Sequence, residues 1–388
     1  MKKILLLLMV LFLTACGAQS NPAIPTEPVT IPITEPPTEP PTAPPTVPPT
    51  EPPTDPPDPI ADKLTAMTNA EKVGQLFLCR YDSVTAPIHT ESYYLGGWIL
   101  FAGDFQGQTI DSIQAELSAL QAISDIPLLM AVDEEGGSVT RISRYSAFRS
   151  SRFSSPRYLY SKGGMDLLLK TEAEKSDLLS NLGINVNVAP VCDITTDPSA
   201  FMYRRSLGLN PEETGTVVAG MVKTMDDHDV HAVLKHFPGY GNNADTHVGI
   251  ARDRRSLEEL EKNDLLPFRA GFEAGANAVL VSHTIVECLD AELPASLSPA
   301  VINYIRTEMD FDGVIVTDDL VMQAITDRYG AGESAVMAIQ AGCDLLCSTE
   351  YVTQYKAVLA AVEENRISPE TLDAAVYRIL RWKQTISQ

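Results

Sequence analysis

Eight short apolar segments, separated mostly by stretches with helical character, constrain the fold of this chain more than any other feature. Each segment is continuously apolar and does not alternate with polar residues, which is typical of parallel strands buried on both faces. The segments are 74–79, 98–101, 128–132, 186–191, 232–237, 278–281, 314–316 and 344–347. Eight strand–helix repeats over this length predict an α/β fold, a single (β/α)₈ barrel of the TIM type.

The stretches between these segments contain helix signals. Asn210 and Ser368 each stand directly before a Pro-Glu sequence, which places a capping residue ahead of a proline at the first helical position. Long apolar-periodic faces occur at 109–124 and 321–341. A doubly wound open sheet is the alternative fold, but it would need a glycine-rich phosphate loop after the first strand, and the sequence has none there.

The amino terminus has the features of an export signal. Lys2 and Lys3 precede an unbroken apolar segment at 4–13, and Leu-Thr-Ala-Cys follows at 13–16. The apolar segment is too short to span a bilayer as a lasting helix. Leu-Thr-Ala-Cys resembles the lipobox of bacterial lipoproteins, which implies a signal peptide at 1–15 and a lipid on Cys16. The alternative is a plain secretory signal with an incidental cysteine.

A proline-rich stretch follows the lipobox. Residues 21–59 contain 17 of the chain's 28 prolines, and Thr-x-Pro-Pro occurs six times between 34 and 57. Proline removes backbone donors and few apolar residues remain to form a core, so this stretch predicts a disordered, extended Pro/Thr-rich linker. At about 3.1 Å per residue it reaches roughly 100 Å. We therefore expect Cys16 and a linker at 16–59 to hold a barrel domain at 60–388 out into the cell wall. The protein would be anchored to the extracellular face of the bacterial cytoplasmic membrane.

Charge and cysteine content exclude several functions. Residues 60–388 contain 27 basic and 45 acidic residues, a net charge of −18. Nucleic acid and anionic lipid both require basic patches, so neither is expected as the main partner. The five cysteines beyond Cys16 lack Cys-x-x-Cys pairs and zinc-site spacing, and we interpret most of them as buried small apolar residues. His228 and His231 are expected to face solvent, and no metal or cofactor is predicted.

Polar residues follow the predicted strands at their carboxyl ends, where barrels carry their functional side chains. They are Asp133, Glu134 and Glu135 after the third strand, Asp193 after the fourth, Lys235 and His236 at the fifth, Ser282 and His283 after the sixth, and Asp318 and Asp319 after the seventh, with Arg141, Arg204 and Arg205 in adjoining loops. Carboxylates, guanidinium groups, a lysine and imidazoles together suit a polyhydroxylated ligand such as a sugar.

The loop after the fifth strand adds a possible general acid/base. Lys-His-Phe-Pro-Gly-Tyr-Gly at 235–241 leads to Asp245 and His247, two residues apart. A carboxylate that orients and polarises an imidazole is the usual arrangement for proton transfer near neutral pH. The alternative is a pair of hydrogen-bonded surface groups.

Four motifs together resemble glycoside hydrolase family 3, and in particular its bacterial β-N-acetylhexosaminidase branch, which trims cell-wall fragments. They are Ala-Val-Asp-Glu-Glu-Gly-Gly at 131–137, Lys-His-Phe-Pro-Gly at 235–239, Asp-Thr-His at 245–247 and Phe-Asp-Gly-Val-Ile-Val-Thr-Asp-Asp-Leu at 311–320. The resemblance runs from about residue 62 to about 385. The family loop normally has a second histidine where this chain has Tyr240, which cannot change charge near neutral pH.

The resemblance implies roles for individual residues. Asp318 would be the nucleophile that forms a glycosyl-aspartate, and His247 the acid/base, oriented by Asp245. Asp318 or Asp319 could instead cap the following helix, and we assign chemistry to Asp318 and structure to Asp319. The positions that match the binding residues for the N-acetylglucosamine ring are Asp133, Arg141, Arg205, Lys235 and His236. Asp193 and His283 are expected to support the barrel mouth.

The resulting expectation is a monomeric, exo-acting, retaining β-N-acetylhexosaminidase that removes β-linked N-acetylglucosamine from cell-wall-derived glycans. A phosphorylase is an open alternative, because a neutral histidine does not repel phosphate as a carboxylate would. A β-glucosidase is less favoured, since family members of that kind have further domains and a different acid/base. An alternative of a different class is a non-catalytic sugar- or wall-binding lipoprotein.

Overall fold

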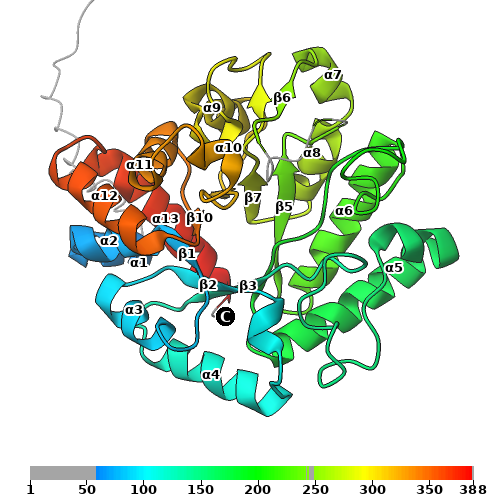
Figure 1. Ribbon diagram of the computed structural model, residues 1–388, viewed down its shortest axis with the longest axis horizontal. Helices are drawn as coiled ribbons and strands as arrows, with labels where there is room; N and C mark the ends of the chain where they lie inside the picture. The colour runs from blue at the N-terminus through cyan, green and yellow to red at the C-terminus, as the bar shows by residue number, and fades with distance from the viewer. Residues whose placement is uncertain (1–57, 242, 244–248, 387–388) are drawn as a thin grey trace, which may run out of the picture. The chain divides into compact units, whose positions relative to one another are not determined.

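The strands of the computed structural model, which describes residues 58–241, 243 and 249–386, form a ring surrounded by helices (Figure 1). The eight strands are all parallel, in the order β10-β1-β2-β3-β4-β5-β7-β9. A parallel bridge from Val316 to Leu345 joins the last strand to the first. The ring is therefore a (β/α)₈ barrel, as predicted, and the open-sheet alternative is wrong.

The strands of the barrel are short. They are β1 Phe77–Arg80, β2 Gly97–Leu100, β3 Leu129–Val132, β4 Val186–Asn187, β5 His231–Phe237, β7 Ala278–Val281, β9 Val314–Thr317 and β10 Leu346–Ser348. Two further strands, β6 Arg252–Asp253 and β8 Ile285–Val286, pair with each other outside the ring. Every predicted strand segment overlaps one of the eight strands, and the differences lie at the ends.

The helices cover the outside of the ring (Figure 1). They are α1 Pro59–Ala66, α2 Asn69–Gln75, α3 Ala86–Tyr93, α4 Ile110–Ala122, α5 Pro156–Asn181, α6 Pro211–Asp226, α7 Leu257–Lys262, α8 Leu265–Glu273, α9 Pro299–Thr307, α10 Gln323–Thr326, α11 Ala331–Ala341, α12 Tyr351–Glu363 and α13 Pro369–Ile386, with 3₁₀ turns η1 Ala102–Phe105 and η3 Ala295–Leu297. The two predicted caps are confirmed: the Asn210 side chain accepts from the nitrogen of Glu213, and that of Ser368 from Thr371.

Three predicted boundaries are wrong for local physical reasons. The segment 74–79 begins inside α2, because the capping box of Thr68 and Glu71 starts a helix that runs to Gln75. The segment 186–191 is a strand only over its first two residues, since Pro190 cannot donate to a ladder. The helical face at 321–341 is divided, because Gly330 is extended and starts α11 anew.

Apolar side chains fill the space between the ring and its helices and extend into the ring itself. The carboxyl-terminal helix α13 ends near the centre of the ring in Figure 1, and its Trp382 is 3% exposed. His231, at the start of β5, packs edge-on against this indole with 6.5 Å between ring centroids. The expectation that His231 faces solvent is therefore wrong, whereas His228 is partly exposed and contacts Asp177.

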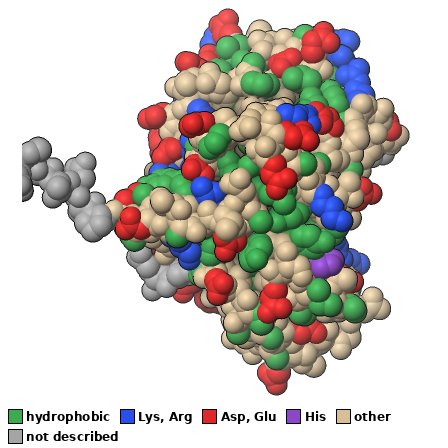
Figure 2. Space-filling view, turned by 90° about the vertical axis from the view of Figure 1, so that its left-hand side faces the viewer, with side chains coloured by type: hydrophobic (Ala, Val, Ile, Leu, Met, Phe, Trp, Pro, Cys, Tyr) green, Lys and Arg blue, Asp and Glu red, His purple; other side chains and the backbone are tan. Residues whose placement is uncertain are grey.

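The cysteine interpretation is confirmed for four of the five residues. Cys79, Cys192, Cys343 and Cys347 are buried, and Cys288 is exposed. Acidic side chains are scattered over the whole face drawn in Figure 2, in keeping with the negative charge of the domain. Among the helices of the described residues, none is long and apolar enough to cross a membrane. The predicted signal peptide, Cys16 and the linker up to residue 57 lie outside the described residues.

Candidate active site

A cavity of about 990 Å³ opens at the carboxyl ends of the barrel strands. Its polar lining includes residues at the predicted strand ends and in the adjoining loops: Asp133, Glu135, Arg141, Arg204, Arg205, Lys235, His236, Asp318 and Asp319. Its apolar lining comes from the inside of the ring and includes Leu78, Ile99, Leu129, Val186, Val233, Leu280, Val316 and Trp382. Six of the predicted site residues, from three strands and two loops, are thus brought into one cavity.

Lys235 is the centre of an ion-pair network on one side of this cavity. Its Nζ lies 2.7 Å from Asp133 Oδ1 and 2.7 Å from Glu135 Oε1. Glu135 also accepts two hydrogen bonds from Arg205, at 3.0 Å from Nε and 2.7 Å from Nη2. Arg141 Nη2 lies 3.3 Å from Asp133 Oδ2. Each of the two carboxylates therefore contacts two cations.

The charges in this network set the protonation of its carboxylates. Burial opposes ionisation of Asp133 and Glu135, but Lys235 and the neighbouring arginines outweigh it, and the pKa of both carboxyls is lowered. Both groups are ionised at neutral pH and act only as hydrogen-bond acceptors. They suit the binding of sugar hydroxyl groups and do not suit proton donation.

His236 is held in one tautomer by its two neighbours. Its Nε2 lies 3.1 Å from Arg205 Nη2, and its Nδ1 lies 2.8 Å from Asp193 Oδ2. Because a guanidinium nitrogen can only donate, Nε2 must accept and the proton must reside on Nδ1. Burial opposes the charge of Asp193, but His236 and the backbone nitrogen of Tyr240 outweigh it and lower the pKa of that carboxyl.

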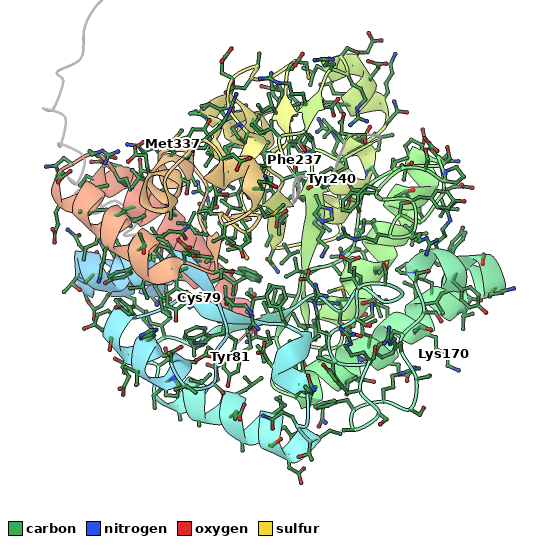
Figure 3. The ribbon with its side chains drawn as sticks, viewed as in Figure 1. Cys79, Tyr81, Lys170, Phe237, Tyr240 and Met337 are labelled. Atoms are coloured by element: carbon green, nitrogen blue, oxygen red, sulfur yellow. The ribbon has the colours of Figure 1, made fainter. Side chains whose placement is uncertain are left out.

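Tyr240 is part of the wall beside this histidine and is almost fully buried. Its ring packs edge-on against His236 and against Phe201, with centroids 5.3 Å and 5.6 Å apart. Figure 3 shows Phe237 and Tyr240 close to each other beside the end of β5. Tyrosine in place of the second histidine of the family loop thus fills an apolar packing position.

Asp318 and Asp319 have different surroundings although they are adjacent. Asp318 Oδ1 accepts from the backbone nitrogen of Asp319 at 2.9 Å, and no ion pair with another described residue holds its carboxylate. Asp319 accepts from Thr349, at 2.6 Å from the hydroxyl and 3.2 Å from the nitrogen. Burial, only partly offset by the Thr349 bonds, raises the pKa of Asp319. Neither residue caps a helix, because α10 begins at Gln323 after Met322.

His283 supports this pair from the sixth strand end. Its Nδ1 lies 2.7 Å from Ser296 Oγ and its Nε2 lies 3.0 Å from the carbonyl oxygen of Asp319. A carbonyl oxygen can only accept, so Nε2 donates to it. His283 thus lies behind the two aspartates, and Asp193 lies behind His236.

Glu135 is the main member of the cavity that the sequence analysis did not assign. An alternation of side chains along the extended chain after β3 could have identified it, since Asp133 and Glu135 then share one face. Glu134 has the opposite orientation and is fully buried, accepting from the backbone nitrogens of Arg141 and Ile142 at 2.6 and 2.8 Å. Phe101 was also missed; it lies under Arg141, with the guanidinium carbon 5.3 Å from its ring centroid.

Asp245 and His247 lie outside the described residues, so the predicted acid/base pair has no described geometry. Within the described ranges, no group of three or more His, Cys, Asp or Glu side chains is placed to hold a metal ion.

The fold and the cavity together define a class: a barrel protein with a fixed network of carboxylates and cations, and a separate carboxylate, at the carboxyl ends of its strands. Residues 68–382 match the sequence model of the glycosyl hydrolase family 3 N terminal domain. The match covers most of the chain, and the chain belongs to glycosyl hydrolase family 3.

Individual relatives agree with this assignment. The chain is 30% identical over 342 residues to beta-hexosaminidase A of Pseudoalteromonas piscicida, covering 80% of this chain and 57% of that protein. It is 31% identical over 328 residues to beta-hexosaminidase LpqI of Mycobacterium tuberculosis, covering 81% of this chain and 82% of the relative. The chain thus spans little more than half of the first relative and most of the second.

Solved structures give the same result. A glycoside hydrolase family 3 beta-N-acetylglucosaminidase from Paenibacillus sp. str. FPU-7 superposes with a TM-score of 0.78 and 34% identity, covering 83% of this chain and 63% of that one. The structure of M. tuberculosis LpqI superposes with a TM-score of 0.76 and 28% identity, covering 82% of this chain and 95% of that one.

Proposed function

We propose that this protein is an exo-acting, retaining β-N-acetylhexosaminidase that removes β-linked N-acetylglucosamine from cell-wall-derived glycans. One observation carries the proposal: in a family 3 barrel, Asp318 lies in the same cavity as the Asp133–Lys235–Glu135 network. The names of the relatives from Pseudoalteromonas, Mycobacterium and Paenibacillus support the choice of substrate.

The network binds the sugar ring. Asp133 and Glu135 accept hydrogen bonds from hydroxyl groups, and charged acceptors make such bonds stronger than neutral ones do. Lys235, Arg141 and Arg205 keep these carboxylates ionised and donate to ring oxygens, and His236 adds a side chain of fixed orientation. The site is rigid before the sugar arrives, which lowers the entropic cost of orienting it.

Asp318 and His247 carry out the reaction. The Asp318 carboxylate attacks the anomeric carbon, and the bond from that carbon to the glycosidic oxygen breaks as His247 gives this oxygen a proton. Water then attacks the glycosyl-aspartate, His247 takes the proton of the water, and Asp318 leaves as a carboxylate. Asp245 orients the imidazole and stabilises its cationic form. Asp319 is held by Thr349 and fixes the backbone beside the nucleophile.

The location follows from the amino-terminal motifs. Residues 1–15 are a signal peptide, Cys16 carries a lipid, and the linker up to residue 59 holds a domain at 60–388 away from the extracellular face of the cytoplasmic membrane. The domain works as a monomer, without nucleic acid, on glycan that diffuses to it or lies in the wall. Release of the protein from membranes by detergent, and its loss from them in a Cys16→Ala variant, tests this location.

The test of the reaction uses residues 60–388 and 4-nitrophenyl N-acetyl-β-D-glucosaminide, with Asp318→Asn and His247→Ala beside the parent. We expect turnover by the parent and almost none by Asp318→Asn. The first-formed sugar should be the β-anomer by proton NMR, because two displacements retain configuration. An α-anomer as first product would rule out a glycosyl-aspartate.

The same assay distinguishes the alternatives. A phosphate-dependent rate with N-acetylglucosamine 1-phosphate as product would make the protein a phosphorylase, because a neutral imidazole admits an anion beside it. Absence of turnover on this substrate and on the matching glucoside, with retained sugar binding, would make it a binding protein.

A further inference from the structure

Arg204 differs from the other cations that line the active-site cavity. Of the five lysine and arginine side chains in the lining, four bind a carboxylate, and these are Arg80 with Asp104, Arg141 with Asp133, Arg205 with Glu135, and Lys235 with both Asp133 and Glu135. The fifth, Arg204, is exposed, and its guanidinium makes no ion pair, hydrogen bond or ring contact with any residue in the described ranges. Its positive charge is therefore available to a ligand.

The backbone around Arg204 is held in place by contacts within the fold. The backbone nitrogen of Arg205 donates to the carbonyl oxygen of Met202 at 2.9 Å. Arg157 Nη1 donates to the carbonyl oxygen of Tyr203 at 2.9 Å, and its guanidinium carbon lies 3.9 Å from the centroid of the Tyr203 ring. These contacts on both sides of Arg204 keep the start of its side chain at the cavity.

Phe201 lies three residues earlier in the same loop and also lines the cavity. It is 37% exposed, although it is a large apolar residue. Its ring packs edge-on against Tyr240, with centroids 5.6 Å apart, and the guanidinium carbon of Arg205 lies 5.8 Å from its centroid. An exposed aromatic ring whose orientation is fixed offers an apolar surface to a ligand. One stretch of loop thus contributes an aromatic surface and a cation to the cavity.

The position of this loop in the barrel indicates which part of a substrate it meets. The loop, residues 188–210, follows β4, whereas the proposed nucleophile Asp318 follows β9. Only β5 and β7 lie between β4 and β9 on the shorter way round the ring of eight, so the two strand ends are nearly across the mouth from each other. In a retaining displacement the nucleophile attacks the face of the sugar opposite the leaving group. The loop therefore borders the side on which the leaving group departs.

We propose that Phe201 and Arg204 form a leaving-group subsite that selects glycans whose leaving group carries a carboxylate. The inference rests on the proposed function, in which Asp318 displaces that group. A planar guanidinium matches a carboxylate with two parallel hydrogen bonds. One cation balances a singly charged carboxylate, whereas a phosphate group carries a charge of about −1.5 to −2. The excess charge of a phosphate would be unfavourable in a domain with a net charge of −18.

The test uses the full chain and three N-acetyl-β-D-glucosaminides that differ in charge: the 4-(carboxymethyl)phenyl, 4-(carbamoylmethyl)phenyl and 4-(aminomethyl)phenyl glycosides. A methylene group separates each substituent from the ring, so the three phenols leave with similar ease. We expect kcat/KM, measured by chromatography of the released phenol, to be highest for the anion and lowest for the cation. The range should be about 3- to 10-fold, in keeping with a partly exposed ion pair. The negative charge of the domain alone would give the opposite order.

Substitutions of Arg204 should change this order. Arg204→Ala should remove the preference for the anion, and Arg204→Glu should reverse it. Arg254→Ala is the matched control, because it removes the same charge from the whole molecule. Arg254 does not line the cavity, and its side chain is 78% exposed; the order should be unchanged in this variant. Phe201→Ala should lower kcat/KM for all three substrates by a similar factor, since their aromatic rings are alike.

Each outcome decides the proposal. Equal kcat/KM for the three substrates in the parent, or a preference for the cation, would overturn the inference while the glycosidase assignment stands. A preference for the anion that persists in Arg204→Ala, or that disappears in Arg254→Ala, would overturn it as well, because the selecting charge would then lie elsewhere. Unchanged rates in Phe201→Ala would overturn the role of the aromatic ring. Absence of turnover with all three substrates would instead overturn the proposed function, and the inference with it.

Discussion

Buried carboxylates and cations form one cluster at each end of the barrel strands, and the two clusters differ in what they leave available. At the carboxyl ends, Asp133 and Glu135 share Lys235 and line the open cavity. At the opposite end, Asp344 precedes β10 and binds Arg306 and Arg378. Asp344 also accepts from the backbone nitrogen of Ile315 at 2.7 Å. The second cluster joins β9, α9 and α13, whereas the first faces the cavity.

The pKa values of the two clusters move in opposite directions. Burial disfavours the charge of every one of these carboxyls. At the mouth, Lys235 and the arginines outweigh burial and lower the pKa of Asp133 and Glu135. At the other end, burial prevails over Arg306 and Arg378 and raises the pKa of Asp344. The comparison indicates that only the mouth cluster is arranged to remain charged over a wide pH range.

The largest expected effect is a loss of catalysis on substitution of Asp318, which belongs to neither cluster. Because no described ion pair involves Asp318, Asp318→Asn should lower kcat by about 10⁴-fold or more, as for loss of a nucleophile, and leave the melting temperature unchanged. Asp319→Asn is the matched control. It should lower the melting temperature, because its two contacts with Thr349 require acceptors, while retaining much more activity. The reverse pattern would exchange the roles of the two residues.

The next effect concerns stability alone. Asp344→Ala leaves Arg306 and Arg378 without this buried partner and should lower the free energy of unfolding by about 3–5 kcal/mol. Asp312→Ala removes a carboxylate that contacts the same Arg378 but is 69% exposed, and should cost about 1 kcal/mol or less. Urea unfolding measures both. Below the unfolding transition, kcat should be unchanged in each variant; a large loss of kcat would connect this cluster to the reaction.

A substitution in the mouth cluster should instead change ligand binding, measured as KM. Glu135→Gln removes the charge that Lys235 and Arg205 bind, and a hydrogen bond to a charged group contributes about 1.5–3 kcal/mol, so KM should rise by about 10- to 100-fold. Glu134→Gln changes the neighbour that binds backbone nitrogens instead of the cavity. It should lower the melting temperature with little change in KM. Similar KM values in both variants would exclude Glu135 from ligand binding.

The barrel itself was predictable because buried parallel strands are continuously apolar and the chain repeats them eight times. The ends of strands were less predictable, since an apolar run such as 74–79 does not distinguish the end of α2 from the start of β1. Most of the cavity's charged residues were predicted from their position after strands. Glu135 was missed because its orientation depends on the local extended path after β3.

Long-range contacts could not be predicted from local pattern at all. Arg255, Asp264 and Gly239 belong to different elements, and their meeting depends on how the segment between β5 and β6 is placed. The sequence around Asp344 likewise predicts only the start of a strand. Its contacts with Arg306 of α9 and Arg378 of α13 form only when the barrel closes.

The smallest expected effect tests whether the balance of neighbouring charges decides the direction of a pKa shift. Asp264 lies near the mouth but behaves like Asp344: burial and the nearby Asp193 and Asp253 outweigh Arg255 and raise its pKa from 3.8 to about 6. The unfolded chain therefore releases this proton at lower pH than the folded one, and the stability associated with Asp264 is full below about pH 4 and is lost as pH rises through about 6. The free energy of unfolding of the parent, minus that of Asp264→Asn, should fall by about 2–3 kcal/mol between pH 4 and 7. Urea unfolding across this range measures the difference. A difference that grows with pH would mean that Arg255 prevails over burial and that Asp264 belongs with the mouth cluster.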